Sequence, residues 1–205
     1  MYPKTIQNFI EKFSKLPGIG PRQATRLAFW LLKGSKEIRQ NLKQALESLD
    51  KDARTCELCH YVIENDGNNK CHFCDNPSRD HTTICVVEKE TDLATIEKSG
   101  VYMGLYHVLG GLFSALDIAV PKNLKMPELV KRIENLKKNK SVEEIILALS
   151  PTYEGDLTAY YLEKLLKPLK VKVTRLGRGL PYGSDVEFAD AQTLSGALES
   201  RKEIK

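Results

Sequence analysis

Apolar residues in the first fifty positions recur three and four residues apart. Three groups show this spacing: Ile6, Phe9, Ile10 and Phe13; Leu27, Ala28, Leu31 and Leu32; and Ile38, Leu42, Ala45, Leu46 and Leu49. Such spacing places one apolar stripe along a helix. Pro21 suits the first turn of a helix and Ser35 suits an N-cap position. The pattern therefore predicts a succession of amphipathic helices over residues 5–50.

The pattern changes twice further along the chain. Over residues 55–81 the apolar periodicity is lost and Cys, Asn, Asp and Gly are frequent. This composition indicates loops that something other than a hydrophobic core must hold in place. From residue 84 onward, strand-like and helical segments alternate: strands at Ile84–Val87, Val101–Leu109, Glu144–Leu149 and Val171–Arg175, and helices at Asp92–Lys98, Pro127–Lys138 and Asp156–Leu169. This alternation predicts an α/β fold with a parallel sheet flanked by helices.

Composition is typical of a soluble globular protein. Of the 205 residues, 41% are hydrophobic and 28% are charged, and no apolar run approaches the roughly 20 residues that span a bilayer. The first residues lead into an amphipathic segment rather than into the apolar stretch of a secretory signal. We therefore expect a cytoplasmic protein without membrane contact. Thiols stay reduced there, so cysteine clusters point to metal or redox chemistry before disulfides.

Positive charge is concentrated in the first quarter of the chain. Residues 1–55 hold eleven Lys and Arg against five Asp and Glu, a local excess of +6, whereas the whole chain carries +4, so the remaining 150 residues sum to −2. A local polyanion-binding surface requires such an excess. A solvated, lysine-rich helical face would give the same count, so charge alone leaves both interpretations open.

Four cysteines stand at the spacing of a zinc site. Cys56 and Cys59 form one Cys-x₂-Cys pair, Cys71 and Cys74 form a second, and 11 residues separate the two pairs. Two such pairs can supply four thiolates to one tetrahedral Zn²⁺. The polar stretch between them cannot build a core, so metal ligation is the natural organiser. The spacing predicts one structural Zn²⁺ per chain, and a lost ligand is expected to unfold residues 55–81 while leaving the 84–175 domain largely intact.

Other uses of these residues are less consistent with the pattern. Cys56–His60 matches the c-type haem attachment motif, but that motif leaves the second cysteine pair unexplained. A redox dithiol would need a surrounding thioredoxin-like βαβ unit, which is missing. His60 or His72 could each replace one cysteine as ligand, although four thiolates already complete the set. Cys85 lies inside a predicted strand and is expected to be a small core residue.

The turn between the first two helical segments has the features of an anion site. Gly18 and Gly20 permit positive φ and leave backbone N–H groups uncovered, and the next helix begins at once with its positive dipole end. The cations beside the turn are Lys15, Arg22 and Arg26. Leu-Pro-Gly-Ile-Gly followed by Ala24 resembles the helix-hairpin-helix family, a sequence-nonspecific DNA-binding element. A tight turn between packed helices is the alternative interpretation.

Acidic residues follow two of the predicted strands. Glu88 comes after the first strand of the α/β part, and Glu154 and Asp156 open the helix after Glu144–Leu149. Both positions fall at the carboxyl ends of parallel strands, where sites usually form. They resemble the Toprim fold, in which a strand-end glutamate and an Asp-x-Asp pair can hold Mg²⁺ for phosphoryl transfer, although Glu154 replaces the first Asp. Capping of the helix N-terminus explains Glu154 and Asp156 equally well.

The order of these features is more specific than any one of them. The helical hairpin, the four cysteines and the Toprim-like part follow one another, and three further motifs accompany them: Tyr106-His107-Val108-Leu109-Gly110-Gly111, Thr152-Tyr153-Glu154-Gly155-Asp156 and the tail Arg178-Gly179-Leu180-Pro181-Tyr182-Gly183. Over nearly its whole length the chain resembles the RecR family of bacterial recombination mediators.

This resemblance implies both a domain organisation and a function. The expected parts are a helix-hairpin-helix DNA-binding region at 1–54, a Cys₄ zinc finger at 55–81, a Toprim domain at 82–176, and a glycine-rich segment with a helix at 177–205. The implied protein is not an enzyme. It binds DNA through the hairpin and acts with RecO, and in some settings RecF, to help load RecA on single-stranded DNA at gaps or breaks. It also forms a ring- or clamp-like homo-oligomer, and Glu88, Glu154 and Asp156 serve partner docking.

Two departures and two rival functions accompany this expectation. Residues 114–120 stand where a Ser-Pro and a Gly-rich turn would be expected, and the 177–183 segment lacks the Gly-Lys-[Ser/Thr] of a nucleotide-binding loop. One rival is a small Toprim metal-dependent nuclease, which Mg²⁺-dependent cleavage of DNA would reveal. The other is a zinc-organised adaptor without DNA contact, which salt-insensitive or absent DNA binding would favour.

Overall fold

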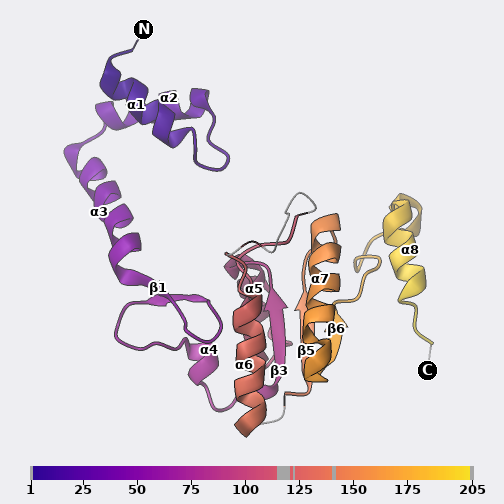
Figure 1. Ribbon diagram of the computed structural model, residues 1–205. Helices are drawn as coiled ribbons and strands as arrows, with labels where there is room; N and C mark the ends of the chain where they lie inside the picture. Colours follow the sequence, from indigo (N-terminus) through magenta and orange to yellow (C-terminus); the bar gives the residue numbers. More distant parts are fainter. Residues whose placement is uncertain (1, 115–120, 122, 140–141, 204–205) are drawn as a thin grey trace. The chain divides into compact units, whose positions relative to one another are not determined.

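The computed structural model describes residues 2–114, 121, 123–139 and 142–203. The chain divides into two compact units, one up to Ala53 and one from Arg54 onward. Figure 1 draws the elements of both units in chain order. Among the described residues, no helix has both the length and the apolar character needed to cross a membrane.

The first unit is made of the three predicted helices. They are α1 (Lys4–Phe13), α2 (Pro21–Lys33) and α3 (Lys36–Asp52). Ala24 and Ala28 of α2 are the buried residues of this unit's described helices, and their small side chains let α1 and α2 approach closely, with Phe9 and Phe13 of α1 stacked beside each other. Ser35 caps α3, since its hydroxyl oxygen accepts a hydrogen bond from the Ile38 amide at 3.3 Å. The local periodicity of the sequence therefore predicted this unit correctly.

Short elements that the sequence pattern did not indicate surround the cysteines. Strands β1 (Ala53–Thr55) and β2 (Val62–Glu64) pair in a two-stranded sheet, and α4 (His72–Asp75) is a single helical turn. Elements of three or four residues are too short to show a periodicity in the sequence.

The α/β part is a four-stranded parallel sheet in the order β4-β3-β5-β6. Its strands are β3 (Asp80–Val87), β4 (Gly104–Val108), β5 (Glu144–Ala148) and β6 (Lys172–Arg175). The helices are α5 (Glu90–Lys98), α6 (Met126–Asn139), α7 (Tyr153–Leu166) and α8 (Ala191–Glu199), with 3₁₀ turns at Lys167–Leu169 and Val186–Phe188. The predicted α/β class with a parallel sheet is confirmed.

Alternate residues of the central strand serve two different cores. Ile84 and Val86 belong to a cluster with residues of α6 and α7, and Figure 1 shows these two helices on the same face of the sheet. Cys85 and Val87 point into a second cluster, which contains Leu93 of α5 and also the four cysteines of residues 56–74. The cysteine-rich module therefore covers part of the second face of the Toprim-like sheet, next to α5. The expectation that a lost metal ligand leaves residues 84–175 largely intact did not take this shared core into account.

Some element boundaries differ from the predicted ones for local reasons. Strand β3 begins at Asp80, earlier than predicted. Its first half is polar and only its second half is buried, so the hydrophobic pattern revealed the second half alone. Helix α7 begins at Tyr153, since Thr152 caps it by accepting a hydrogen bond from the Gly155 amide at 3.1 Å. Of the divergent 114–120 segment, residues 115–120 lie outside the described part of the chain.

Candidate DNA-binding hairpin and metal centre

The connection between α1 and α2 is a tight turn centred on Pro17 and Gly18. The Ile19 amide donates a hydrogen bond to the Leu16 carbonyl at 3.1 Å, and Gly18 has φ +76°. Proline at the second position and a residue with positive φ at the third are the signature of a type II turn. Gly18 is therefore the residue of this turn that must be glycine.

Gly20 has a different role from the one the sequence suggested. Its φ of −84° is ordinary extended backbone, and its amide donates a hydrogen bond to Gln23 Oε1 at 3.2 Å. This amide is therefore occupied rather than free to meet an anion. Pro21 has no amide hydrogen, so the donors without an intrahelical partner at the start of α2 are those of Arg22 and Gln23.

The three cations beside the turn are exposed but differ in their partners. Lys15 forms an ion pair with Glu11 at 3.6 Å, and both side chains are largely in solvent, so the pair is weak. No ion pair within the described part of the chain engages Arg22 or Arg26. Arg22 and Arg26 lie four residues apart on α2 and therefore share one face. They leave two uncompensated positive charges beside the turn.

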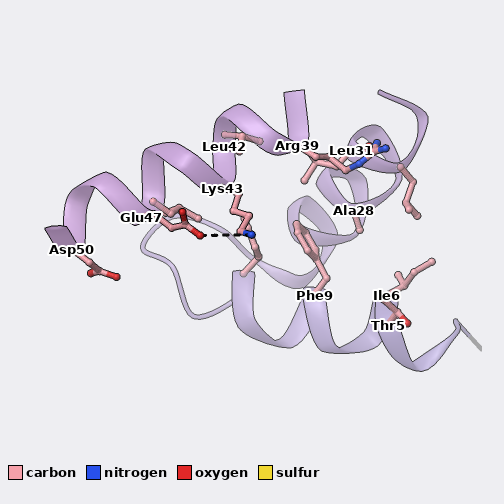
Figure 2. A pocket seen from close by; sticks show the side chains of 13 residues that line it. Thr5, Ile6, Phe9, Ala28, Leu31, Arg39, Leu42, Lys43, Glu47 and Asp50 are labelled. Atoms are coloured by element: carbon pink, nitrogen blue, oxygen red, sulfur yellow. Dashed lines mark hydrogen bonds and ion pairs between the residues drawn. The ribbon is translucent and has the colours of Figure 1, made fainter. Parts of the chain in front are cut away.

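A groove of about 450 Å³ lies between the three helices of the same unit. Figure 2 shows Ile6 and Phe9 of α1 and Leu31 of α2 lining it, with Leu42 of α3 on the other wall. At its rim, Lys43 pairs with Glu47 at 3.7 Å. Leucines of α2 and α3 that line the groove are exposed, among them Leu32 at 59%, Leu42 at 46% and Leu46 at 60%. The groove is therefore an apolar surface open to solvent.

The fold brings the four predicted metal ligands together. The Sγ atoms of Cys56, Cys59, Cys71 and Cys74 all lie within 4.8 Å of one another, and all four residues are buried and free of disulfides. Tetrahedral zinc with Zn–S distances of about 2.3 Å requires sulfur atoms about 3.8 Å apart. The spacing of these thiols fits that requirement, and the chemistry of the set, four sulfurs without oxygen, fits zinc.

Backbone hydrogen bonds hold the two cysteine pairs in place. The Cys71 amide donates to Cys56 Sγ at 3.3 Å, and the Cys56 amide donates to the Tyr61 carbonyl at 2.8 Å. Hydrogen bonding, first of all with Cys59, lowers the pKa of the Cys56 thiol, which favours a thiolate there. His60 and His72 do not belong to the group of ligand atoms found among the described residues. Burial raises the pKa of Cys85 to about 12, in keeping with a core thiol.

The three acidic residues at the strand ends do not form a comparable group. Among the described residues, the four cysteines alone make a cluster of three or more metal-ligating side chains. Glu154 is exposed in the first turn of α7, and Glu88 is partly buried just after β3. Asp156 forms ion pairs with Arg175, at 2.6 Å, and with Arg178.

The environment of Asp156 explains its charge state and the glycine before it. Burial would raise the pKa of this carboxyl, but hydrogen bonds from Arg178 and Arg175 lower it below its ordinary value. Gly155 is needed because a Cβ there would meet the Ser150 carbonyl oxygen at 2.0 Å. The Glu-Gly-Asp segment is thus fixed against the end of β5, with Asp156 turned to two arginines.

The glycine-rich tail is attached to the same region. Besides its ion pair with Asp156, Arg178 accepts a hydrogen bond at its carbonyl from Ser200 Oγ at 2.5 Å. A Cβ on Gly196 of α8 would come within 3.1 Å of Arg178 Cβ, so α8 packs closely on this segment. The tail is held to α7 through Arg178.

Sequence analysis missed two buried arginines near the metal centre. Arg79 forms a two-pronged ion pair with Glu97 at 2.8 and 2.9 Å, and Arg132 of α6 reaches Cys74 Sγ at 3.4 Å. Arg132 lies three residues after Leu129 and four before Leu136, so helical spacing places it beside the apolar face of its helix. This spacing is the signal that could have singled out Arg132, whereas no comparable spacing marks Arg79, which lies outside the helices and strands.

Together, the helical hairpin, the cysteine cluster and the parallel sheet define a helix-hairpin-helix and Toprim protein. Residues 6–49 match the family described as RecR, helix-hairpin-helix, residues 82–177 match the Toprim domain, and residues 179–202 match RecR, C-terminal. Curated relatives named Recombination protein RecR come from Bifidobacterium longum subsp. infantis, 44% identical over 98% of both chains, and from Pelotomaculum thermopropionicum, 44% identical over 100% of this chain and 98% of the relative. A third, from Chloroherpeton thalassium, is 44% identical over 97% of both chains. The chain belongs to the RecR family.

Proposed function

We propose that this protein is a DNA-binding recombination mediator whose DNA contacts begin at the α1–α2 hairpin. The observation that carries the proposal is the pair of exposed, uncompensated arginines Arg22 and Arg26 beside the free amides at the start of α2. Charges and amides of this kind act on phosphate, so binding is independent of base sequence. Lys15 adds to this surface in part, since Glu11 offsets its charge.

The double variant Arg22→Ala/Arg26→Ala tests the hairpin directly. It should weaken binding to all DNA sequences alike and flatten the slope of log K against log salt by about 0.9 for each lost phosphate contact on duplex DNA. The matched control is Lys33→Ala/Lys36→Ala, which removes two exposed cations of the same unit, one at the end of α2 and one at the start of α3. If the wild type and the arginine variant bind DNA with equal affinity and equal salt slope, the DNA-binding surface lies elsewhere.

The role in the cell follows the family expectation. The protein acts in DNA repair with RecO, and with RecF in some settings, to promote RecA loading on single-stranded DNA. Relatives that are 44% identical over nearly full length carry the name Recombination protein RecR, which supports this role. RecA-filament formation on gapped DNA coated with single-strand-binding protein, measured with and without RecO, tests it.

The metal in this proposal is one structural Zn²⁺ bound by Cys56, Cys59, Cys71 and Cys74. Zinc would supply no catalytic step here, because all four positions of a tetrahedral site are filled by thiolates. Its contribution would be to hold β1, β2 and α4 against the Toprim sheet. Elemental analysis of the purified protein tests this assignment.

The protein assembles as a homo-oligomer, for which the groove of the first unit offers an apolar surface. The leucines of α3 that line the groove, Leu42 and Leu46, are exposed to an extent that favours burial against a partner. A second copy is a suitable occupant because the groove carries both the apolar stripe and its receiving walls, as a two-fold contact requires. Charges of both signs at the rim, such as Lys43 and Glu47, can pair across such a contact.

The Toprim part serves docking in this proposal and no reaction. Asp156 is turned to Arg175 and Arg178 instead of to a shared metal-binding position. Glu88 and Glu154 offer carboxylates at the same sheet edge to a basic surface of RecO. The protein is proposed to act in the cytoplasm.

A further inference from the structure

Arg132 is a buried cation in contact with a predicted metal ligand. The residue is only 6% exposed, although it stands in the middle of α6. One guanidinium nitrogen, Nη2, donates a hydrogen bond to Cys74 Sγ at 3.4 Å. The other, Nη1, donates to the Tyr106 carbonyl oxygen at 2.5 Å. The guanidinium therefore bridges the cysteine cluster and the edge strand of the sheet.

In the described part of the chain, the charge of Arg132 has no ion pair with a carboxylate. Arginine is rarely buried unless it is paired, because an unpaired charge out of water costs several kcal/mol. Among the ion pairs of the described residues, none joins Arg132 to Asp or Glu. Arg79, the other buried arginine, is balanced by Glu97 at 2.8 Å. The comparison leaves the sulfur cluster as the group that can compensate Arg132.

A zinc-loaded cluster has the charge that Arg132 requires. Four thiolates around one Zn²⁺ leave two negative charges in excess, spread over the sulfur atoms. This cluster is itself buried, since none of the four cysteines is more than 8% exposed. A cation and hydrogen-bond donor beside one sulfur lowers the cost of burying that excess. The positive charge of Arg132 and the negative charge of the metal centre thus compensate each other, which lowers the cost of burying both.

The position of Arg132 also closes the open edge of the sheet. Strand β4 is an edge strand, and three of its backbone groups find partners outside the sheet. The Gly104 carbonyl accepts from Arg79 Nε at 2.8 Å, the Tyr106 carbonyl accepts from Arg132, and the Val108 amide donates to the Cys59 carbonyl at 2.8 Å. Unpaired groups of an edge strand need such cover. Arg132 therefore supplies one of the contacts that join the cysteine module to the edge strand of the Toprim sheet.

We propose that Arg132 is the outer-shell cation of the metal centre, which neutralises the zinc-bound Cys74 thiolate and locks the cysteine module onto the Toprim sheet. This inference rests on the proposed zinc site and adds to it a residue that selects for the metal-loaded state. Four zinc-bound thiolates carry an excess of negative charge beside the Arg132 guanidinium, which contacts Cys74 Sγ at 3.4 Å. Metal binding and docking of the module are thus coupled through one side chain.

The test uses four variants of the full-length protein, each with a single substitution. Arg132→Met keeps the length of the side chain without charge or donors, Arg132→Gln keeps donors without charge, and Arg132→Lys keeps the charge without the two-pronged geometry. Lys131→Met is the matched control, because it removes a positive charge from the exposed neighbouring position of α6. Zinc affinity is measured by competition with a chromophoric chelator under reducing conditions, and Co²⁺ loading gives the sulfur-to-metal charge-transfer band.

Zinc affinity should fall about 10- to 100-fold in Arg132→Met and Arg132→Gln, the range found for outer-shell partners of metal ligands. Arg132→Lys should lose less than these two, and Lys131→Met should match the wild type. The charge-transfer band should move to lower energy where the donor to Cys74 is lost, which a purely structural role of Arg132 would not produce. In the absence of metal, Arg132→Met should be at least as stable as the wild type.

Each outcome decides the proposal. Unchanged zinc affinity and band position in folded Arg132→Met, or equal losses in Arg132→Lys and Arg132→Gln, would overturn it. If the neutral variants fail to fold with zinc present, folding of Arg132→Lys supports the role of the charge and its failure to fold refutes it. A wild-type protein without zinc by elemental analysis would instead refute the metal site itself.

Discussion

Withdrawal of the metal should weaken the Toprim sheet as well as the cysteine module. The four cysteines share one core cluster with Cys85, Val87, Tyr106 and Val108 of the sheet. The Tyr106 ring is fully buried and packs on Phe73 of the cysteine module at 5.3 Å between ring centroids. Loss of zinc, by a chelator or by Cys59→Ser, removes the packing of the cysteine module on the sheet.

The size of the effect follows from what the sheet loses. Re-exposure of an aromatic side chain such as Tyr106 costs about 2 kcal/mol. Two edge hydrogen bonds, from the Val108 amide to Cys59 and from Arg132 to the Tyr106 carbonyl, contribute a net of about 1 kcal/mol each. The sheet should therefore lose about 4 kcal/mol, a large share of the roughly 5–15 kcal/mol that holds a domain together.

Hydrogen exchange resolved by peptide, together with thermal melting, measures this loss. A melting temperature lower by about 10 °C is expected for a second unit of about 150 residues, together with faster exchange of amides in β3 and β4. Helices α1–α3 serve as the internal control, since they belong to the other unit. The single tryptophan of the chain, Trp30, lies in α2, so its fluorescence should not change. Unaltered protection of β3 and β4 in metal-free protein would refute the shared-core reasoning.

Two further outcomes concern the partners. Leu46→Glu places a charge on the groove of the first unit, where Leu46 is 60% exposed, and should reduce the mass measured by light scattering, whereas Gln40→Glu, exposed but outside the groove, should not. Glu154→Ala should weaken RecO association several-fold in a pull-down or calorimetric titration and leave DNA binding of the free protein intact, with no cleavage of plasmid DNA in Mg²⁺. A stable oligomer in the first case, or full RecO affinity in the second, would contradict the respective surface.

The closed turn of the hairpin illustrates how far local sequence determines this protein. Pro17-Gly18 specified the turn, the apolar stripes specified α1 to α3, and the βα alternation specified the parallel sheet, because each depends on residues within a few positions of one another. The spacing of the four cysteines was likewise enough to expect their convergence, which the fold confirms. The positive φ and uncovered amide expected at Gly20 are not found, since its amide donates to a side chain three residues ahead.

Tertiary structure alone decided how the parts of the second unit depend on one another. Arg132 meets Tyr106 and Cys74, which lie 26 and 58 residues away, and Asp156 meets Arg178, which lies 22 residues away. The sequence placed Asp156 at a strand-end site and gave no partner for Arg132, because a local pattern carries no information on which distant group will neutralise a charge. The pairing of the buried Arg132 charge is set by packing between α6, the cysteine module and the edge strand, which share one core cluster with the sheet.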